Sequence, residues 1–148
     1  MKKYVLDTNL YVQAFRSEEG ARQLREFYVA FTPGTYLSSI VLHELLVGAN
    51  TEAKHRSIME TLGIPLRRAG RVVTPTHAAW LASAEALARM ARRQKRDLRS
   101  VPKSLLNDYL LAASCREAGA TLVTDNAADF KEARRYLRFD YMAPWPGM

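Results

Sequence analysis

Short apolar runs alternate along this chain with longer segments of helical periodicity. The apolar runs are bounded by turn or polar residues and therefore predict strands. The predicted strands are residues 3–6, 35–38, 71–73, 121–123 and, at a sheet edge, 139–142. The predicted helices are residues 9–15, 17–29, 40–47, 51 to about 63, 77–95, 104–118 and 127–136. Strands alternating with helices imply an α/β fold, in which a parallel sheet carries helices on both faces.

Residues with capping and breaking preferences set several of the expected boundaries. Ser39 is the expected N-cap of the helix over 40–47, and Thr76 the expected N-cap of the long helix after it. Gly63 together with Pro65 is expected to end the helix that begins at Thr51, and Gly119 the helix that begins at Ser104.

The overall composition indicates one soluble globular domain. Its 148 residues suit a single domain over residues 1–142, and residues 143–148 read as a short C-terminal tail with two prolines and a glycine. We find neither an apolar run of about 18 residues nor a signal-like start, so no membrane segment is expected. The single cysteine, Cys115, reads as a small core residue and fits a reducing, cytoplasmic compartment.

The net charge of +7 comes almost entirely from one stretch between Arg89 and Lys103. Only Asp97 opposes the bases there, which leaves +6, while the rest of the chain has 15 basic and 14 acidic residues. The stretch is either a solvated helix face or a patch that follows the phosphates of a nucleic acid. Its basic residues are Arg89, Arg92, Arg93, Lys95, Arg96, Arg99 and Lys103.

Three acids occur in apolar surroundings, where an unpaired carboxylate is costly. Asp7 ends the first strand, at the edge where open α/β sheets place their ligands. Glu44 lies on a helix made mostly of Ile, Val and Leu, and Asp108 shares a stripe with Leu111 and other apolar residues. Each has a structural alternative: a helix N-cap for Asp7, a surface position for Glu44, and a dipole-favoured first-turn acid for Asp108. His43 faces away from Glu44, because neighbouring helix residues do not share a face.

A fourth acidic segment follows the strand over 121–123. Asp125, Asn126 and Asp129 occur there, although Thr124 and Asn126 also suit plain turn chemistry. Oxygen ligands without a Cys or His cluster favour a hard cation such as Mg²⁺ or Mn²⁺. The sequence has no Gly-rich phosphate loop, which argues against nucleotide-dependent transfer.

Taken together, these segments resemble PIN-domain ribonucleases, specifically the VapC-like toxins of toxin–antitoxin pairs. The resemblance extends over nearly the whole chain and rests on the order and spacing of four segments. They are Val5-Leu6-Asp7-Thr8-Asn9, residues 39–48 with Glu44, Asn107-Asp108-Tyr109-Leu110-Leu111-Ala112-Ala113, and residues 119–130.

The resemblance implies a PIN-like three-layer α/β/α sandwich around a mainly parallel sheet of about four to five strands. It implies an endoribonuclease that hydrolyses RNA phosphodiesters with a water activated by Mg²⁺ or Mn²⁺. Asp7, Glu44 and Asp108 match the family's three most regular acidic positions. Asp129, Asp125 or Asn126 would complete the site, with Asp129 expected among the catalytic acids.

The resemblance also implies neighbouring groups and partners. Thr124, Asn126 and Asn9 would orient the carboxylates by hydrogen bonds. VapC-like toxins pair with a VapB-like antitoxin and usually form homodimers, so both partners are expected beside the RNA substrate. The basic stretch would guide that RNA.

Two other functions are compatible with parts of the pattern. A catalytically silent PIN-type module that binds RNA or protein would share the fold, but it has no need for a set of buried acids. A haloacid-dehalogenase-like enzyme would use Asp7 as a covalent nucleophile. That chemistry usually has a second Asp two residues later, where this chain has Asn9.

Overall fold

Five parallel strands form the centre of the structure, a computed structural model that describes residues 1–144. The strands are β1 (Lys3–Leu6), β2 (Thr35–Ser38), β3 (Val72–Val73), β4 (Ala120–Val123) and β5 (Asp140–Met142). They are ordered β3-β2-β1-β4-β5, and every neighbouring pair is parallel. The expected parallel sheet, including an edge strand near the C-terminus, is confirmed.

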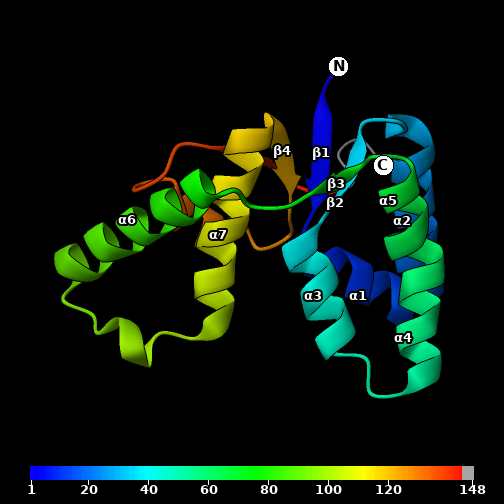
Figure 1. Ribbon diagram of the computed structural model, residues 1–148, viewed down its shortest axis with the longest axis horizontal. Helices are drawn as coiled ribbons and strands as arrows, with labels where there is room; N and C mark the ends of the chain where they lie inside the picture. The colour runs from blue at the N-terminus through cyan, green and yellow to red at the C-terminus, as the bar shows by residue number, and fades with distance from the viewer. Residues whose placement is uncertain (145–148) are drawn as a thin grey trace.

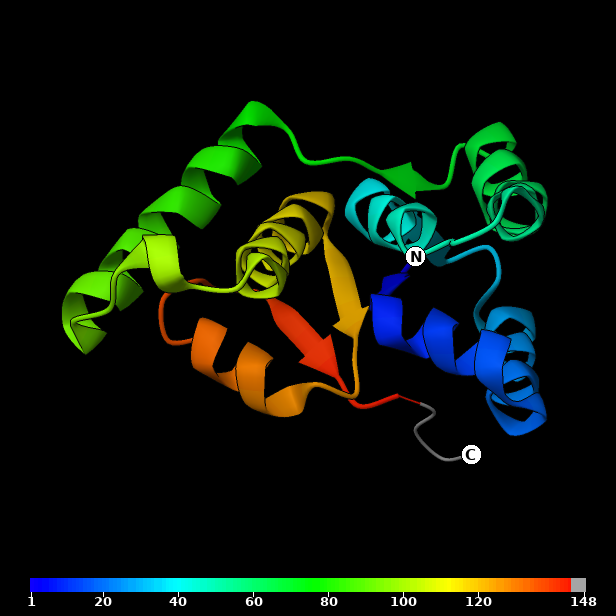
Figure 2. The same ribbon diagram turned by 90° about the horizontal axis from the view of Figure 1, so that it is seen from below.

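Helices cover both sides of this sheet. In Figures 1 and 2, α6 and α7 lie on one side, while α1, α2, α4 and α5 lie on the other. The three-layer arrangement expected from the sequence is therefore confirmed. The helical elements are α1 (Thr8–Arg16), α2 (Glu18–Phe31), α3 (Ser39–Val47), α4 (Glu52–Ile58), the π-helical η1 (Met59–Gly63), α5 (Ile64–Arg68), α6 (His77–Gln94), the 3₁₀ turn η2 (Leu98–Ser100), α7 (Lys103–Ala118) and α8 (Ala127–Ala133).

The strand order creates a topological switch point between β1 and β4. The chain moves from β1 to β2 and β3 on one side, then returns to β4 and β5 on the other. At the carboxyl ends of the two central strands, the Asp7 N–H donates to the Val123 carbonyl over 2.9 Å. Ligands of open α/β sheets bind at such a point.

The core joins the sheet to α7 and α1. Leu122 and Val123 of β4 are fully buried, as is Leu10 of α1. Cys115 of α7 is fully buried as predicted, and its burial raises the pKa of the thiol to about 12. The sheet is thus held rigidly from both faces at the level of the switch point.

One predicted helix end is wrong. Gly63 and Pro65 do not end the helix begun at Glu52, because helical structure continues to Arg68. The π-helical turn explains the continuation: the Ile64 N–H bonds to the Met59 carbonyl, and Pro65 then falls in the first turn of α5. Proline is tolerated in a first turn because its missing N–H would have no helical partner there.

The cap of α3 is displaced by one residue from its expected position. Ser38, not Ser39, is the N-cap, and its hydroxyl accepts from the Ile40 N–H over 3.1 Å. The Ser39 hydroxyl instead forms a 2.6 Å hydrogen bond with that of Thr74. Thr76 caps α6 as predicted, and Gly119 ends α7 in the left-handed region at φ 67°.

The chain ends differ in how far the structure describes them. The expected tail over 143–148 lies mostly outside the described residues, so its prediction stays untested. Across residues 1–144, no helix is long and apolar enough to span a membrane.

We predict that Gly20→Ala will destabilise the fold, because α1 and α2 meet closely at Gly20. An added Cβ would lie 2.5 Å from the Gln13 carbonyl oxygen, which belongs to the backbone of α1. We expect a loss of about 1–3 kcal/mol in the free energy of unfolding, measured with urea.

Gly48→Ala is the matched control for this substitution. At Gly48 the nearest atom to an added Cβ is the Glu44 carbonyl oxygen at 3.4 Å, and the backbone is right-handed helical. We expect a change within about 1 kcal/mol there. Equal losses in the two variants would contradict the close approach of α1 and α2.

Candidate metal centre

Asp7 lies at the junction between β1 and α1, at the carboxyl end of a central strand. It follows β1, is the N-cap of α1, and is 5% exposed. Its Oδ1 accepts from the Thr8 N–H over 2.8 Å, and its Oδ2 accepts from the Thr124 hydroxyl over 2.8 Å. The capping role considered from the sequence is thus real, and it coexists with a second contact across the switch point.

Glu44 reaches the same region from α3. This helix starts directly after β2, so its first turns lie at the carboxyl edge of the sheet. The Thr8 hydroxyl donates to Glu44 Oε1 over 2.9 Å, and Glu44 is half-buried. The apolar residues of α3 are not all buried: Leu45 is 5% exposed, whereas Val47 is 74% exposed. His43 is exposed, as predicted.

Asp108 is brought in by the second turn of α7 and is half-buried. Burial is the largest cause of a rise in its pKa to about 8. The charges of Asp7, Asp129 and Glu44 raise the pKa of Asp108 further. A carboxyl that responds to three other acids lies in a cluster of like charges.

The segment after β4 contributes its polar groups through a local hydrogen-bond network. The Asn126 N–H donates to the Thr124 hydroxyl over 2.9 Å, and the Asn126 side-chain amide donates to Asp129 Oδ2 over 2.9 Å. The Gln13 side-chain amide donates to Asp125 Oδ2 from α1. Asp129 is therefore oriented by Asn126, whereas Asp125 is tied to α1 through Gln13.

Electrostatic coupling shows which acids the fold brings together. Burial raises the pKa of Asp7, the Thr124 and Thr8 hydrogen bonds lower it, and the charges of Glu44 and Asp125 raise it again. The charges of Asp7, Glu44 and Asp129 thus act on Asp108, and the charges of Glu44 and Asp125 act on Asp7.

The oxygen donors of the cluster fit a hard divalent cation that binds only one or two carboxylates directly. Within residues 1–144, no group of three or more His, Cys, Asp or Glu side chains is arranged to hold a metal ion. Mg²⁺ usually keeps several waters and binds one or two carboxylates, so it does not require such a group. The oxygen-only chemistry and the raised pKa values of Asp7 and Asp108 agree with a cation that neutralises this cluster.

Comparison with protein families settles what kind of domain this is. The family model described as "PIN domain" matches residues 4–136, which include all of the acids above. The chain belongs to the PIN domain family. A search of curated protein sequences gives no match.

Solved structures with the same PIN fold come from toxin–antitoxin complexes. A chain of DNA-bound VapBC from Salmonella typhimurium is 23% identical with a TM-score of 0.71, and the match covers 98% of this chain and 99% of that one. A chain of VapBC-1 from nontypeable Haemophilus influenzae is 20% identical at 0.68, covering 96% and 97%. A chain of DNA-bound VapBC2 from Rickettsia felis is 24% identical at 0.63, covering 95% and 97%. At these identities the likeness shows the fold.

Two groups in this PIN domain were missed by sequence reasoning. The contact expected of Asn9 is made by Thr8, and Asn9 is exposed in the first turn of α1. Gln13 was not considered, although it holds Asp125. A hydroxyl directly after a strand-end acid was a usable signal for Thr8, while nothing near Gln13 in the sequence pointed to a residue 112 positions away.

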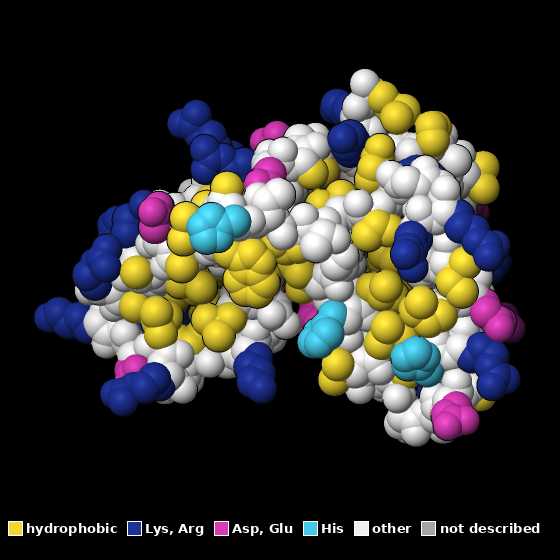
Figure 3. All heavy atoms as spheres, viewed as in Figure 1, with side chains coloured by type: hydrophobic (Ala, Val, Ile, Leu, Met, Phe, Trp, Pro, Cys, Tyr) yellow, Lys and Arg dark blue, Asp and Glu magenta, His cyan; other side chains and the backbone are white. Residues whose placement is uncertain are grey.

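The basic stretch divides into engaged and available side chains. The Arg89 guanidinium donates to the Tyr136 carbonyl, and Arg99 pairs with Asp97 over 2.9 Å. Figure 3 shows a hollow between the α6–α7 side and the α3–α4 side, with an acidic side chain visible inside it. The other basic residues of the stretch are all exposed: Arg92, Arg93, Lys95, Arg96 and Lys103.

We predict that, without divalent ions, Asp108→Asn will stabilise the protein more at pH 8 than at pH 5. The pKa of Asp108 rises from 3.8 to about 8 on folding, so between these values the folded protein holds a proton that the unfolded chain has released. Its contribution to the free energy of unfolding therefore falls as pH rises through this window and levels off above it.

The measurement is thermal unfolding in EDTA between pH 5 and 8.5. We expect the midpoint of Asp108→Asn to gain at least about 4 °C on the wild type across this range, which corresponds to about 1–2 kcal/mol in a chain of this size. Asp125→Asn, at the margin of the cluster, is the control. Parallel pH profiles for Asp108→Asn and wild type would contradict the raised pKa.

Proposed function

We propose that this PIN domain is a Mg²⁺- or Mn²⁺-dependent endoribonuclease that acts in the cytoplasm as the toxin of a VapBC-type toxin–antitoxin system. The observation that carries the proposal is the convergence of Asp7, Glu44, Asp108 and Asp129 at the sheet's switch point. Like charges in a poorly solvated place are costly unless a cation compensates them. A function in metal-dependent hydrolysis accounts for their presence.

Asp7 and Asp108 would hold the ion, with Glu44 and Asp129 completing the site and Asp125 at its margin. When bound, the ion would polarise the phosphodiester and activate a water for in-line attack. The protein's own contribution is orientation. Thr124 fixes one oxygen of Asp7, and Thr8 fixes one oxygen of Glu44. Asn126 does the same for Asp129, so the acids are preorganised before substrate arrives.

The basic stretch supports RNA as the substrate. A polyanion must approach a site that is itself negative, and cations beside the site offset that repulsion. The available cations lie at the end of α6 and before Asp108 in α7. We infer that they bind phosphates of the RNA farther along the strand from the cleaved bond, on the α6–α7 side of the molecule (Figure 1).

The toxin role rests on the fold likeness to VapBC chains over nearly their full length. We infer a VapB-like antitoxin as partner and a homodimer as the toxin assembly. RNA, the antitoxin and a second copy of the chain are thus the proposed partners.

The first test is cleavage of total cellular RNA by the purified protein with Mg²⁺, Mn²⁺ or EDTA. We predict discrete fragments with either metal and none with EDTA. Asp7→Asn and Asp108→Asn should each lower the rate at least about 100-fold, because each removes a charge that holds the ion. Their circular dichroism should match the wild type. Full cleavage by either folded variant would contradict the assignment, and a folded wild type that cuts no RNA would favour a silent binding module.

A separate prediction concerns the basic stretch. Combined Arg92→Glu, Arg93→Glu and Arg96→Glu substitutions should weaken RNA binding and flatten its dependence on salt, because each phosphate contact adds about 0.7 to the slope for a single strand. The readout is fluorescence anisotropy of a labelled RNA between 50 and 300 mM salt, a range of the order in which such contacts weaken.

Arg67→Glu with Arg68→Glu, on exposed α5, is the control for nonspecific charge effects. An unchanged slope in the triple variant would make the stretch a solvated face.

A further inference from the structure

A second hollow lies beside the acid cluster, between α1, α3 and α4. Its volume is about 460 Å³, within the range of about 300–1,000 Å³ typical of small-molecule sites. Two helices line it with residues at i, i+3 and i+4 spacing, which places them on one helical face. They are Val12, Phe15 and Arg16 on α1, and Lys54, Ser57 and Ile58 on α4.

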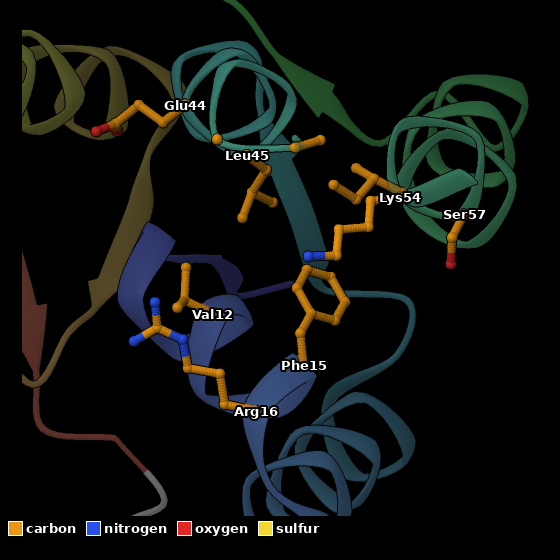
Figure 4. A pocket seen from close by; sticks show the side chains of 10 residues that line it. Val12, Phe15, Arg16, Glu44, Leu45, Lys54 and Ser57 are labelled. Carbon is orange, nitrogen blue, oxygen red and sulfur yellow. The ribbon is translucent and has the colours of Figure 1, made fainter. Parts of the chain in front are cut away.

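The third wall joins this hollow to the acids. Glu44 belongs both to the hollow's lining and to the acid cluster. In Figure 4 its carboxylate points away from the hollow, while the neighbouring Leu45 points into it. Helix α3 therefore lies between the hollow and the acid cluster (Figure 4). The small residues Gly48 and Ala49 continue this wall and leave the space open.

The lining combines an aromatic ring with two cations. Phe15 is 53% exposed, and its ring points into the hollow (Figure 4). Lys54 extends across the hollow toward Phe15, and Arg16 folds back alongside Val12. An open aromatic face suits a stacked base, and a nearby ammonium or guanidinium suits a phosphate. Val12 and Leu45 supply an apolar wall against which the other face of the base or its sugar can pack.

We propose that this hollow is a nucleotide subsite, which takes one base of the bound RNA onto Phe15 and an adjacent phosphate onto Lys54. The inference rests on the proposed ribonuclease function and adds a position of base recognition to it. In an RNA bound at Asp7 and Asp108, a nucleotide that flanks the cleaved bond would enter the hollow, because Glu44 borders both places. Selection of that base would make cleavage depend on sequence.

The test is binding of labelled single-stranded RNA hexamers of each base to protein in the Asp7→Asn background, which prevents cleavage. Phe15→Leu keeps apolar bulk but removes the ring, and Phe15→Tyr restores it. We expect Phe15→Leu to weaken binding of at least one hexamer about tenfold, since stacking on a ring contributes about 1–3 kcal/mol per base. Phe15→Tyr should keep the wild-type affinity.

Lys54→Gln should lower the slope of affinity against salt by about 0.7, as for one lost phosphate contact. Arg56→Gln is the matched control, because Arg56 is exposed on the same helix and is not part of the hollow's lining. Arg56→Gln should change the RNA affinity and its slope against salt less than Lys54→Gln does. All these side chains except Phe15 are polar and exposed, so folding is expected to persist and is checked by circular dichroism.

The outcomes separate this inference from the proposed function. The subsite is overturned if each of the four hexamers binds Phe15→Leu as tightly as it binds the parent protein with Phe15, or if no hexamer binds at all. The hollow would then be left to a protein segment. Cleavage of total RNA by the wild type is measured independently. If the wild type cleaves RNA but Phe15→Leu leaves hexamer affinity unchanged, the subsite alone is refuted. If the wild type does not cleave RNA, the proposed function is refuted.

Discussion

The buried carboxylate of Asp7 is the constraint on which the site depends. Its two oxygens are held by the Thr8 N–H and the Thr124 hydroxyl, so a charge-bearing group is fixed where water has little access. Burial and the charges of Glu44 and Asp125 raise its pKa. A fold that keeps such a group in place leaves it either protonated or beside a compensating cation. A divalent cation is the ligand whose chemistry matches oxygen donors alone.

The rest of the architecture serves to bring other acids to that point. Parallel strands place their carboxyl ends on one edge, and the order β3-β2-β1-β4-β5 puts the ends of β1 and β4 side by side there. Helices α3 and α7 then deliver Glu44 and Asp108 from two different sides of β1. The same placement of α3 leaves a hollow on its other flank, so Glu44 borders both the acid cluster and the hollow.

The sequence pattern correctly predicts features that depend on neighbouring residues, such as strand ends and several helix caps. Strand ends and the acid after β1 follow from short apolar runs, and Thr76 and Gly119 set their helix boundaries by intrinsic preferences. The sequence does not distinguish Ser38 from Ser39 as the cap of α3, because both offer the same chemistry. The two are distinguished by the contact of Ser39 with Thr74. The sequence predicts a helix stop at Pro65, because the π-helical turn that precedes it leaves no sequence signal.

Features that depend on distant residues were out of reach of the sequence. The bond between Thr8 and Glu44 spans 36 positions, and that between Gln13 and Asp125 spans 112. The hollow is assembled from three helices, each of which looks ordinary alone. Likewise, the hydrogen bond from Arg89 to the Tyr136 carbonyl joins α6 to a residue 47 positions later in the sequence. Arg89 is therefore not available for RNA binding, although the sequence counts it among the basic residues of the stretch.

The most direct test of the account is anomalous diffraction from crystals of the protein soaked in Mn²⁺. The account predicts a single strong peak in contact with the carboxylates of Asp7 and Asp108, absent from crystals of Asp108→Asn soaked in the same way. A wild-type crystal with no peak at the switch point, or with Mn²⁺ only on other acids, would contradict the claim that these carboxylates form a metal centre.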